Sequence, residues 1–409
     1  MKTYIVLTSD FYVDRDANGI CIKNVIDELK NRGNHVYVIC NGEKTEVVQK
    51  DVVCVKKNIF SKFDSECSSI ISKILYNLML WVRRIFLAII SLVSYPNVSF
   101  LRTRSVYKEL CKLYNMVDAD CVVGVFRPYE NIEALSMFKK VHKNVSTVAV
   151  YFDLPKCNSN FGNAINEYLD WLWLCANRRT FSINDYIMFP QNVKMKYDEE
   201  YSSESDKFIY FDFPMFVQRP IKEHTSSAEC FNIVYAGSID GVNRSAMYFL
   251  QLIDILRQSD ELNINVYFYG NITEEKILNK YKCCSYVKFM GKIDSSEVFD
   301  KLCSADCLLN VSNRITYDMI PSKIFQMFSS CRKIINIISN KNDFSICYFE
   351  KYPAVLNIEE YNKNIDKDVM ALKDFINTDF TDELRFNYVR DTYIKNTPES
   401  FVDSLINCQ

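Results

Sequence analysis

Residues 231–258 read FNIVYAGSIDGVNRSAMYFLQLIDILRQ, and this stretch decides the fold. Its first seven residues are mostly aromatic or β-branched, which predicts a strand that ends at Gly237. Residues 246–258 carry apolar side chains three and four positions apart, which predicts an amphipathic helix. A strand that leads through a short polar turn into a helix is the repeating unit of a parallel sheet covered by helices.

The same alternation continues on both sides of this stretch. In the C-terminal half we expect strands at 231–237, 264–270, 286–291, 307–312 and 333–338, and helices at 246–258, 274–282, 295–305 and 324–328. In the N-terminal half we expect strands at 3–8, 35–40, 121–126 and 146–152, and a helix from Ile20 to Asn31. The sequence therefore predicts an α/β protein with two doubly wound, Rossmann-like domains that face a cleft.

The domain boundary is expected in the polar residues 194–207 and in the segment that follows them to residue 229, which read as a surface linker. We therefore divide the chain into residues 1–215, residues 216–395 and residues 396–409. The last segment is expected to form a helix from Pro398 to Leu405, capped by Thr397, that packs back on the N-terminal domain.

The composition limits the class of protein. Apolar residues make up 48% of the 409 residues, and a formal net charge of -2 gives no reason to expect a nucleic-acid partner. The sixteen cysteines form no CxxC pair, and the first residues read as a strand rather than a signal peptide, so we expect a cytoplasmic protein. Cys303 and Cys307 have no histidine nearby and are expected to be packed thiols rather than zinc ligands.

Residues 69–96 are strongly apolar but are interrupted by Lys73, Arg83 and Arg84. The longest uncharged run is shorter than the ~20 residues that a spanning helix needs. Polar side chains share one helical face, which is typical of an interfacial helix whose cations meet anionic lipid at the inner face of the membrane. The alternative is a core helix of the first domain with two snorkelling arginines.

Glycine is scarce, with nine in the chain, and several glycines follow predicted strands. Gly237 is followed by Ser238, and Arg244 stands at the start of the next helix. A guanidinium beside free helix N–H groups suits a phosphate group, although a solvated arginine near a helix start is the alternative.

A second candidate for phosphate binding precedes the short helix at 324–328. Ser322 is placed to donate to a phosphate oxygen, and Lys323 supplies a positive charge. The alternative is that Ser322 only caps the helix and Lys323 is only solvated. Together with Arg244 on the same sheet edge, these residues predict a site for a pyrophosphate.

The C-terminal half resembles the donor-binding half of a GT-B glycosyltransferase, closest to family 4 and related capsule or exopolysaccharide enzymes. The motifs that carry the resemblance are Tyr235-Ala236-Gly237-Ser238 with Arg244, Tyr269-Gly270, Phe289-Met290-Gly291, Pro321 to Phe325, and Ile334-Ile335. The N-terminal half resembles the acceptor-binding domain more faintly, through Gly19 and the stretch GNHVYVI at 33–39.

This resemblance implies a sugar nucleotide along the second domain, with Arg244 and Lys323 facing its pyrophosphate. The main chain near Gly270 and Lys292 would border the base. The family's two glutamates, eight positions apart, fall here on Asp318 and Gln326, and Gln326 would meet the donor ribose. The family's Gly-Lys-Pro falls on Cys331-Arg332-Lys333.

Candidate acceptor-side residues lie in the first domain. Asp153 follows the strand at 146–152, where it could act as a base or simply cap a turn before Pro155. Arg127 follows the strand at 121–126 and suits an acceptor diphosphate or a surface ion pair. Asp118 and Asp120 precede this strand, so we interpret them as its polar entrance.

The predicted function is a metal-independent transfer of a sugar from a nucleotide sugar, here taken to be a UDP-sugar, to a lipid-linked glycan. No cofactor is expected, and the resemblance favours retention of the anomeric configuration. Two alternatives stay open. One is a catalytically silent GT-B subunit that binds a partner transferase or a glycan, and the other is a sugar-nucleotide epimerase.

Overall fold

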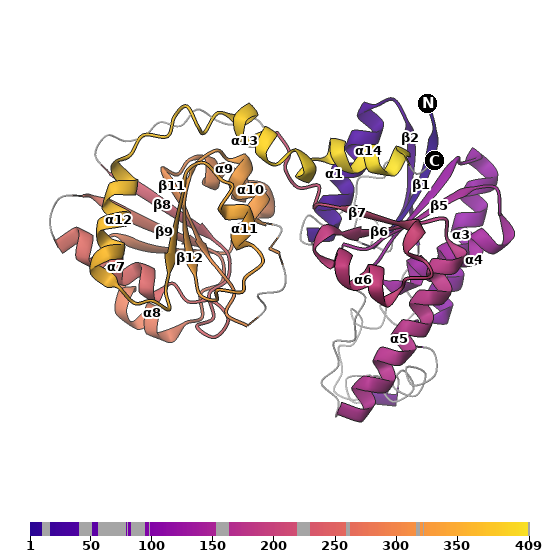
Figure 1. Ribbon diagram of the computed structural model, residues 1–409, viewed down its shortest axis with the longest axis horizontal. Helices are drawn as coiled ribbons and strands as arrows, with labels where there is room; N and C mark the ends of the chain where they lie inside the picture. Colours follow the sequence, from indigo (N-terminus) through magenta and orange to yellow (C-terminus); the bar gives the residue numbers. More distant parts are fainter. Residues whose placement is uncertain are drawn as a thin grey trace, which may run out of the picture. The chain divides into compact units, whose positions relative to one another are not determined.

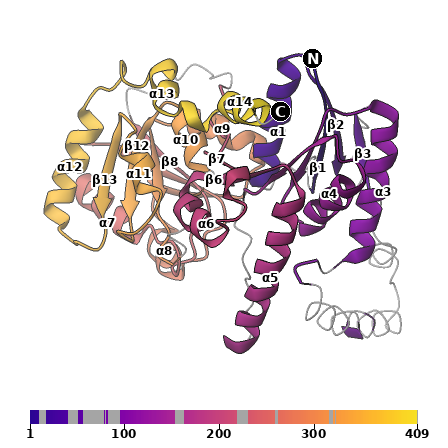
Figure 2. The ribbon, with the colours of Figure 1, turned by 45° about the vertical axis from the view of Figure 1, so that its right-hand side comes forward.

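The computed structural model describes residues 1–9, 17–40, 51–55, 79, 81–82, 95–97, 99–152, 163–218, 230–258, 262–315, 320–321 and 323–407. The chain divides into two compact units. The first contains Met1–Pro214 and Pro398–Gln409, and the second contains Met215–Thr397. Each unit is built around one parallel sheet (Figures 1 and 2).

The sheet of the first unit has the strand order β3-β2-β1-β4-β5-β6-β7. Its strands are β1 (Thr3–Thr8), β2 (His35–Cys40), β3 (Val52–Cys54), β4 (Cys121–Val125), β5 (Ser146–Val150), β6 (Tyr186–Pro190) and β7 (Phe208–Phe211). Every neighbouring pair is parallel. The strand order reverses direction between β1 and β4, which is the switch point of a Rossmann-like sheet.

The helices of the first unit cover this sheet. They are α1 (Ala17–Asn31), α3 (Phe100–Val117), α4 (Tyr129–Val141), α5 (Asn163–Ile183), α6 (Lys194–Glu200) and α14 (Pro398–Asn407). Helix α14 lies beside α1 in both views (Figures 1 and 2). Arg32, directly after α1, donates to Asp403 Oδ1 of α14 at 2.5 Å and to the main-chain oxygen of Glu399 at 3.0 Å. The C-terminal helix therefore belongs to the first unit.

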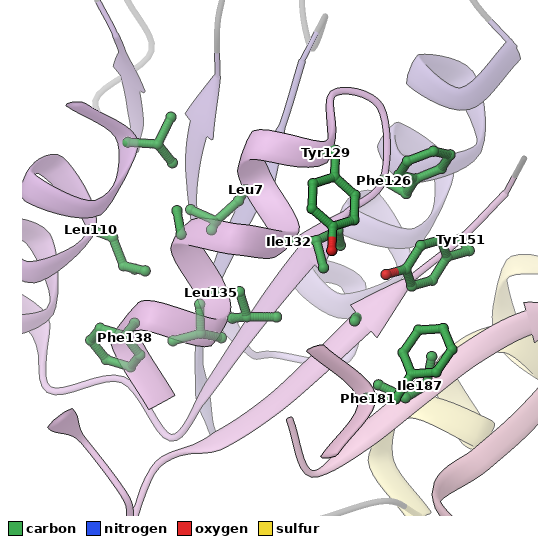
Figure 3. Packing of buried hydrophobic residues seen from close by; sticks show 14 of the residues in the cluster. Leu7, Leu110, Phe126, Tyr129, Ile132, Leu135, Phe138, Tyr151, Phe181 and Ile187 are labelled. Carbon is green, nitrogen blue, oxygen red and sulfur yellow. The ribbon is translucent and has the colours of Figure 1, made fainter. Parts of the chain in front are cut away.

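The core of the first unit fills the space between β1, β4, β5 and their helices (Figure 3). Leu110 of α3 and Leu135 and Phe138 of α4 are fully buried. Tyr129 and Tyr151 turn their hydroxyl groups toward the same space (Figure 3). Because the central strands are covered on both faces, they are apolar almost throughout rather than alternating.

The sheet of the second unit has the strand order β10-β9-β8-β11-β12-β13, again all parallel. Its strands are β8 (Phe231–Ala236), β9 (Ile264–Tyr269), β10 (Val287–Gly291), β11 (Cys307–Val311), β12 (Lys333–Ile338) and β13 (Val355–Glu359). The helices are α7 (Met247–Gln258), α8 (Glu275–Tyr281), α9 (Ser295–Cys303), α10 (Lys323–Ser329), α11 (Ile346–Phe349), α12 (Ile365–Asn377) and α13 (Phe386–Thr392). Its switch point lies between β8 and β11.

A ladder of asparagine amides fixes the register of three strands in the second sheet. Asn310, Asn336 and Asn357 are paired in register on β11, β12 and β13. Asn310 Nδ2 donates to Asn336 Oδ1 at 2.7 Å, and Asn336 Nδ2 donates to Asn357 Oδ1 at 2.8 Å. A slip of β12 by one residue would break both bonds and leave the buried amide group of Asn336 without partners.

Two expectations about local structure are wrong. Residues 194–207 are not a linker, because they form α6 and a 3-10 turn that lead into β7 on the edge of the first sheet. The first helix begins at Ala17 rather than Ile20, so Gly19 lies in its first turn and is buried.

Most of the segment 69–96 lies outside the described residues, which include only 79, 81–82 and 95–96 of it. Within the part of the chain that the structure describes, none of the helices combines the length and the apolar character needed to cross a membrane. The prediction of an interfacial helix at 69–96 stays a prediction.

Candidate functional site

The chemistry-bearing residues of the second unit gather where β8 and β11 end. In open α/β sheets, ligands bind outside the carboxyl ends of the strands at the switch point, and here that point lies between these two strands. The loop from Gly237 to Arg244 follows β8, and Ser312 to Arg314 follow β11. These two loops form the candidate site.

The main chain is unusually close-packed at the ends of β8, β9 and β10. Gly237 N donates to Tyr269 O at 2.8 Å, and Gly270 N donates to Gly291 O at 2.8 Å. Gly270 has a φ of +135°, and a Cβ added there would lie 1.9 Å from the main-chain oxygen of Gly237. Only glycine therefore fits at position 270.

A single carboxylate fixes the loop after β8. Asp240 Oδ1 accepts hydrogen bonds from the main-chain N–H groups of Val242 at 2.9 Å, Asn243 at 2.8 Å and Arg244 at 3.1 Å. Desolvation acts to raise the pKa of Asp240, but these N–H groups outweigh it, and the pKa lies below its usual value. The main chain of Arg244 is thereby anchored.

The side chain of Arg244 is held from two sides. Its Nε donates to Asn313 Oδ1 at 2.7 Å, and Asn313 follows β11. Burial raises the pKa of Tyr235, while the positive charge of Arg244 and a hydrogen bond with it act in the opposite direction. The guanidinium thus lies within reach of both Asn313 and Tyr235, and the Tyr235 hydroxyl itself donates to Ser238 O at 3.0 Å.

Lys323 begins α10, which follows β11 at the same edge of the sheet as Arg244. Its pKa is lowered from the ordinary lysine value, first by desolvation and second by repulsion from Arg244. Lys323 as a whole residue is exposed. The main-chain N–H of Ile324 donates to Pro321 O at 3.1 Å, so this N–H group is already paired.

A buried glutamate, Glu274, contacts the loop that follows β8. Glu274 is 8% exposed, and its Oε1 accepts from Ser245 Oγ at 2.8 Å. Within the described residues, its Oε2 is buried and has no hydrogen-bond partner. Desolvation raises the pKa of Glu274, and the bond from Ser245 opposes this shift. A Cβ added to Gly241, which has a φ of +78°, would lie 2.9 Å from Glu274 Cγ.

Arg314 ties the same loop to β12 and β13. Its Nη1 donates to Gly241 O at 3.2 Å, and its Nη2 forms an ion pair with Glu360. Glu360 Oε2 in turn accepts from Ser339 Oγ at 2.9 Å. Side chains at the ends of β11, β12 and β13 therefore hold the loop after β8 in place.

The other residues predicted to bind the donor differ in their burial, and some of them lie outside the described residues. Gly291, at the end of β10, has a φ of +74°, and Lys292 after it is exposed. Gln326 is half-buried on α10, and its main-chain oxygen accepts from Ser329 Oγ at 3.1 Å. Asp318 and Ser322 lie outside the described residues.

The carboxyl edge of the first sheet carries a separate group of polar residues. Arg127 follows β4, is exposed and has a φ of +66°. Glu130, in the first turn of α4, is 5% exposed, and desolvation raises its pKa while the charge of Arg102 opposes the shift. Gly19 is buried in α1, and Asp153 lies outside the described residues.

At the opposite edge, Asp120 Oδ2 accepts from Thr3 N at 2.7 Å, which agrees with a polar entrance to β4. Cys303 and Cys307 are both buried. Among the described residues, no group of three or more His, Cys, Asp or Glu side chains is placed to hold a metal ion.

Sequence reasoning missed Asn313, Glu274 and Arg314. Asn313 and Arg314 stand directly after a strand that was predicted, at the edge where Gly237 and Arg244 were recognised. Their position was a usable signal. Glu274 had none, because an acidic residue at the start of a helix is ordinarily a solvated first-turn residue.

No protein-family model matches the sequence, and no curated protein sequence matches it. Solved structures share its fold. WaaG, a glycosyltransferase involved in lipopolysaccharide biosynthesis, is 13% identical with a TM-score of 0.53 over 98% of each chain. WaaB, a lipopolysaccharide outer core galactosyltransferase, is 10% identical with a TM-score of 0.51 over 99% of this chain and 100% of WaaB.

A putative UDP-N-acetylglucosamine 2-epimerase from Listeria monocytogenes is similar to the same extent. It is 9% identical with a TM-score of 0.56 over 100% of this chain and 98% of the epimerase chain. These likenesses, together with the two parallel sheets, show that the chain has the GT-B fold. The predicted fold class is confirmed.

Proposed function

We propose that this chain, with its GT-B fold, is a glycosyltransferase that moves a sugar from a nucleotide-sugar donor to a glycan acceptor. The observation that carries the proposal is the pair of cations, Arg244 and Lys323, at the carboxyl edge of the second sheet. Two positive charges at the same edge of the sheet suit a ligand with adjacent negative groups, such as the diphosphate of a nucleotide sugar.

The two cations have a direct role in this proposal. Negative charge grows on the diphosphate as it departs from the sugar, and Arg244 and Lys323 would stabilise it without a metal ion. In retention of configuration, a phosphate oxygen of the donor takes the proton of the acceptor, and Asp318 steadies the sugar. In inversion, Asp153 takes the proton.

The rest of the donor would extend along the same edge. In this proposal the main chain at Gly270 and Lys292 borders the base, which we take to be that of a UDP-sugar, and Gln326 meets the ribose. Ser238 and Ser322 donate to phosphate oxygens. The resemblance to family 4 of the glycosyltransferases supports this arrangement at Gly237, Ser238, Arg244 and Lys323, whereas Gln326 and Cys331-Arg332-Lys333 depart from the family pattern.

The acceptor in this proposal is a lipid-linked glycan of surface polysaccharide synthesis. Arg127 supports it, because an exposed arginine at the carboxyl edge of the first sheet suits an acceptor diphosphate. Gly19 lies on the helix that follows β1 at the same edge. Residues 69–96 would hold the protein at the inner face of the cell membrane.

The test is donor turnover by a double variant. Purified protein is assayed against UDP-, GDP-, TDP- and CMP-sugars for hydrolysis and transfer, and the best donor is then used with Arg244→Ala combined with Lys323→Ala. We expect turnover to fall by at least about a hundredfold, because two charge-assisted contacts are lost. Arg385→Ala, which removes an exposed cation paired with Asp382, is the control and should retain full turnover.

Other outcomes separate the alternatives. Undiminished turnover in the double variant would refute the phosphate assignment. Interconversion of two UDP-sugars without transfer would identify an epimerase, in agreement with the fold likeness to the Listeria protein. If calorimetry shows no binding of any nucleotide, a silent GT-B subunit is favoured. The residues Gln326 and Cys331-Arg332-Lys333, which differ from the family pattern, also suggest this alternative.

A further inference from the structure

Asn313 joins the two loops that flank the switch point of the second sheet. It follows β11, whereas its partners Asn243 and Arg244 follow β8. Its Oδ1 accepts from Arg244 Nε at 2.7 Å and from Asn243 Nδ2 at 3.1 Å. One oxygen atom therefore receives a side-chain bond from each of two consecutive residues of the other loop.

The main chain repeats this connection. Arg314 N donates to Asn243 O at 2.8 Å, and Ile315 N donates to Asn243 Oδ1 at 3.0 Å. Asn313 itself is 5% exposed. A buried acceptor whose loop is fixed by neighbouring main-chain bonds has little freedom to move, so it fixes the direction of the guanidinium that it holds.

We propose that Asn313 is the positioning residue of Arg244, and that it aims the two terminal guanidinium nitrogens at the diphosphate of the donor. This inference rests on the proposed function. Asn313 accepts from Nε and so does not occupy the terminal nitrogens Nη1 and Nη2, which an end-on contact with a phosphate group uses. Asn313 acts through Arg244 and need not touch the ligand.

The neutrality of the amide is part of the assignment. A carboxylate at position 313 would accept the same bond but would form an ion pair with Arg244 and compensate its charge. An amide oxygen orients the guanidinium and leaves the whole positive charge for the ligand. Asn313→Asp should therefore preserve the fold and still weaken diphosphate binding.

The experiment measures nucleoside diphosphate binding to the full chain by calorimetry. The probe is whichever of UDP, GDP, dTDP and ADP the wild-type protein binds most tightly. We expect Asn313→Ala to raise Kd about tenfold, which is the effect of losing a hydrogen bond to a charged group. Asn313→Asp should raise Kd at least as much and leave Tm unchanged.

A double-variant cycle separates positioning from a structural role. If Asn313 acts through Arg244, Asn313→Ala should have no further effect on Kd in an Arg244→Ala background. Asn357→Ala, which removes the last amide of the ladder on β13, is the matched control and should lower Tm without changing Kd. If Asn313→Ala does not fold, Asn313→Asp enters the same cycle.

Three results would overturn the inference. An unchanged Kd in both Asn313 variants would do so while leaving the proposed function intact. The same loss of affinity in the wild-type and Arg244→Ala backgrounds would show that Asn313 acts on the fold rather than through Arg244. Failure of the wild-type protein to bind any of the four nucleotides would remove both the proposed function and this assignment.

Discussion

At the scale of single residues, Gly270 shows how tightly the strand ends are packed. Its φ of +135° is a conformation that L side chains rarely adopt, and its Cβ position is blocked by the main-chain oxygen of Gly237. Gly291, with a φ of +74°, shares the backbone requirement, but nothing lies within 4 Å of its Cβ position. A comparison of Gly270 with Gly291 therefore separates the cost of a steric clash from the cost of backbone strain.

We predict that Gly270→Ala lowers the free energy of unfolding by about 3 kcal/mol, because backbone strain adds to a clash with the main chain. Gly291→Ala should cost only about 1 kcal/mol, the strain alone. Urea denaturation of both variants measures the difference. Equal losses would contradict the close approach of Gly237 to Gly270.

A pH prediction follows from Lys323. Its pKa is lowered by desolvation and by Arg244, so the ammonium loses its proton at a lower pH than an ordinary lysine does. Only the charged form attracts a diphosphate. Binding of the nucleoside diphosphate should therefore weaken as pH rises through this lowered pKa, with the loss beginning below pH 10.5, the ordinary lysine value.

Lys323→Arg is the matched control for this titration. A guanidinium stays protonated throughout the accessible range, so the variant should show no comparable decline of affinity with pH. Calorimetric Kd values at several pH values up to 10 check both proteins. The same pH profile in wild type and Lys323→Arg would mean that another group is responsible.

How far the sequence predicts the site depends on the kind of residue. Arg244 and Lys323 could be recognised because each follows a strand or opens a helix in a known motif. The position of Asn313 after a predicted strand marks it as a candidate, but its role does not follow from the sequence, because that role depends on a bond to a loop about seventy positions away. Cys331, where the resembling family has glycine, has a φ of +52°, so the backbone keeps a conformation that the sequence no longer signals.

At the scale of elements, strands β1, β2, β4, β5 and β8 to β12 were predicted with errors of at most two residues, whereas β3, β6, β7 and β13 were not predicted. Strands β8 to β12 are apolar runs that end at glycine or polar residues. Strands β3 and β7 lie at the sheet edge and have only three and four residues. A short, half-buried strand has too few residues for its pattern to differ from that of a loop.

A lysine that is distant in the sequence caps the C-terminal end of α12, and no residue near that helix end predicts this contact. Lys333, the first residue of β12, donates from Nζ to Ile376 O at 2.8 Å and to Thr378 O at 2.5 Å, both at the end of α12. A cation at a helix C-terminus satisfies carbonyl groups that have no partner within the helix. Lys207 contacts three carbonyl groups at the end of α5 in the same way.

We predict that Lys333→Met lowers the free energy of unfolding by about 2 kcal/mol, because the charge-assisted bonds are lost while the aliphatic stem is kept. Lys367→Met, in the first turn of α12, is the control. It removes an exposed cation from the positive end of the same helix and should change stability by less than about 0.5 kcal/mol. Equal effects in thermal unfolding would contradict the capping role of Lys333.

At the scale of the whole molecule, the two sheets share the order of their first six strands, and the first sheet has a seventh strand, β7, at its edge. The chain enters the first unit twice. It leaves the first unit after Pro214, builds the second, and returns at Pro398. The returning helix is held by more than the Arg32 contact, because Phe401 packs against Phe152 and Phe211 with ring centroids 5.9 and 4.8 Å away. Stability of the first unit therefore depends on the last residues of the chain.

We predict that Phe401→Ala destabilises the first unit by about 3 to 5 kcal/mol, the cost of a cavity at a buried aromatic site. Hydrogen exchange should accelerate in α1, β7 and α14, while the strands of the second unit keep their protection. Nucleoside diphosphate affinity should be unchanged, because the proposed diphosphate contacts belong to the second unit. Phe344→Ala, at a side chain that is 47% exposed in the second unit, should alter exchange in neither sheet. A uniform loss of protection across both sheets would show instead that the two units unfold as one.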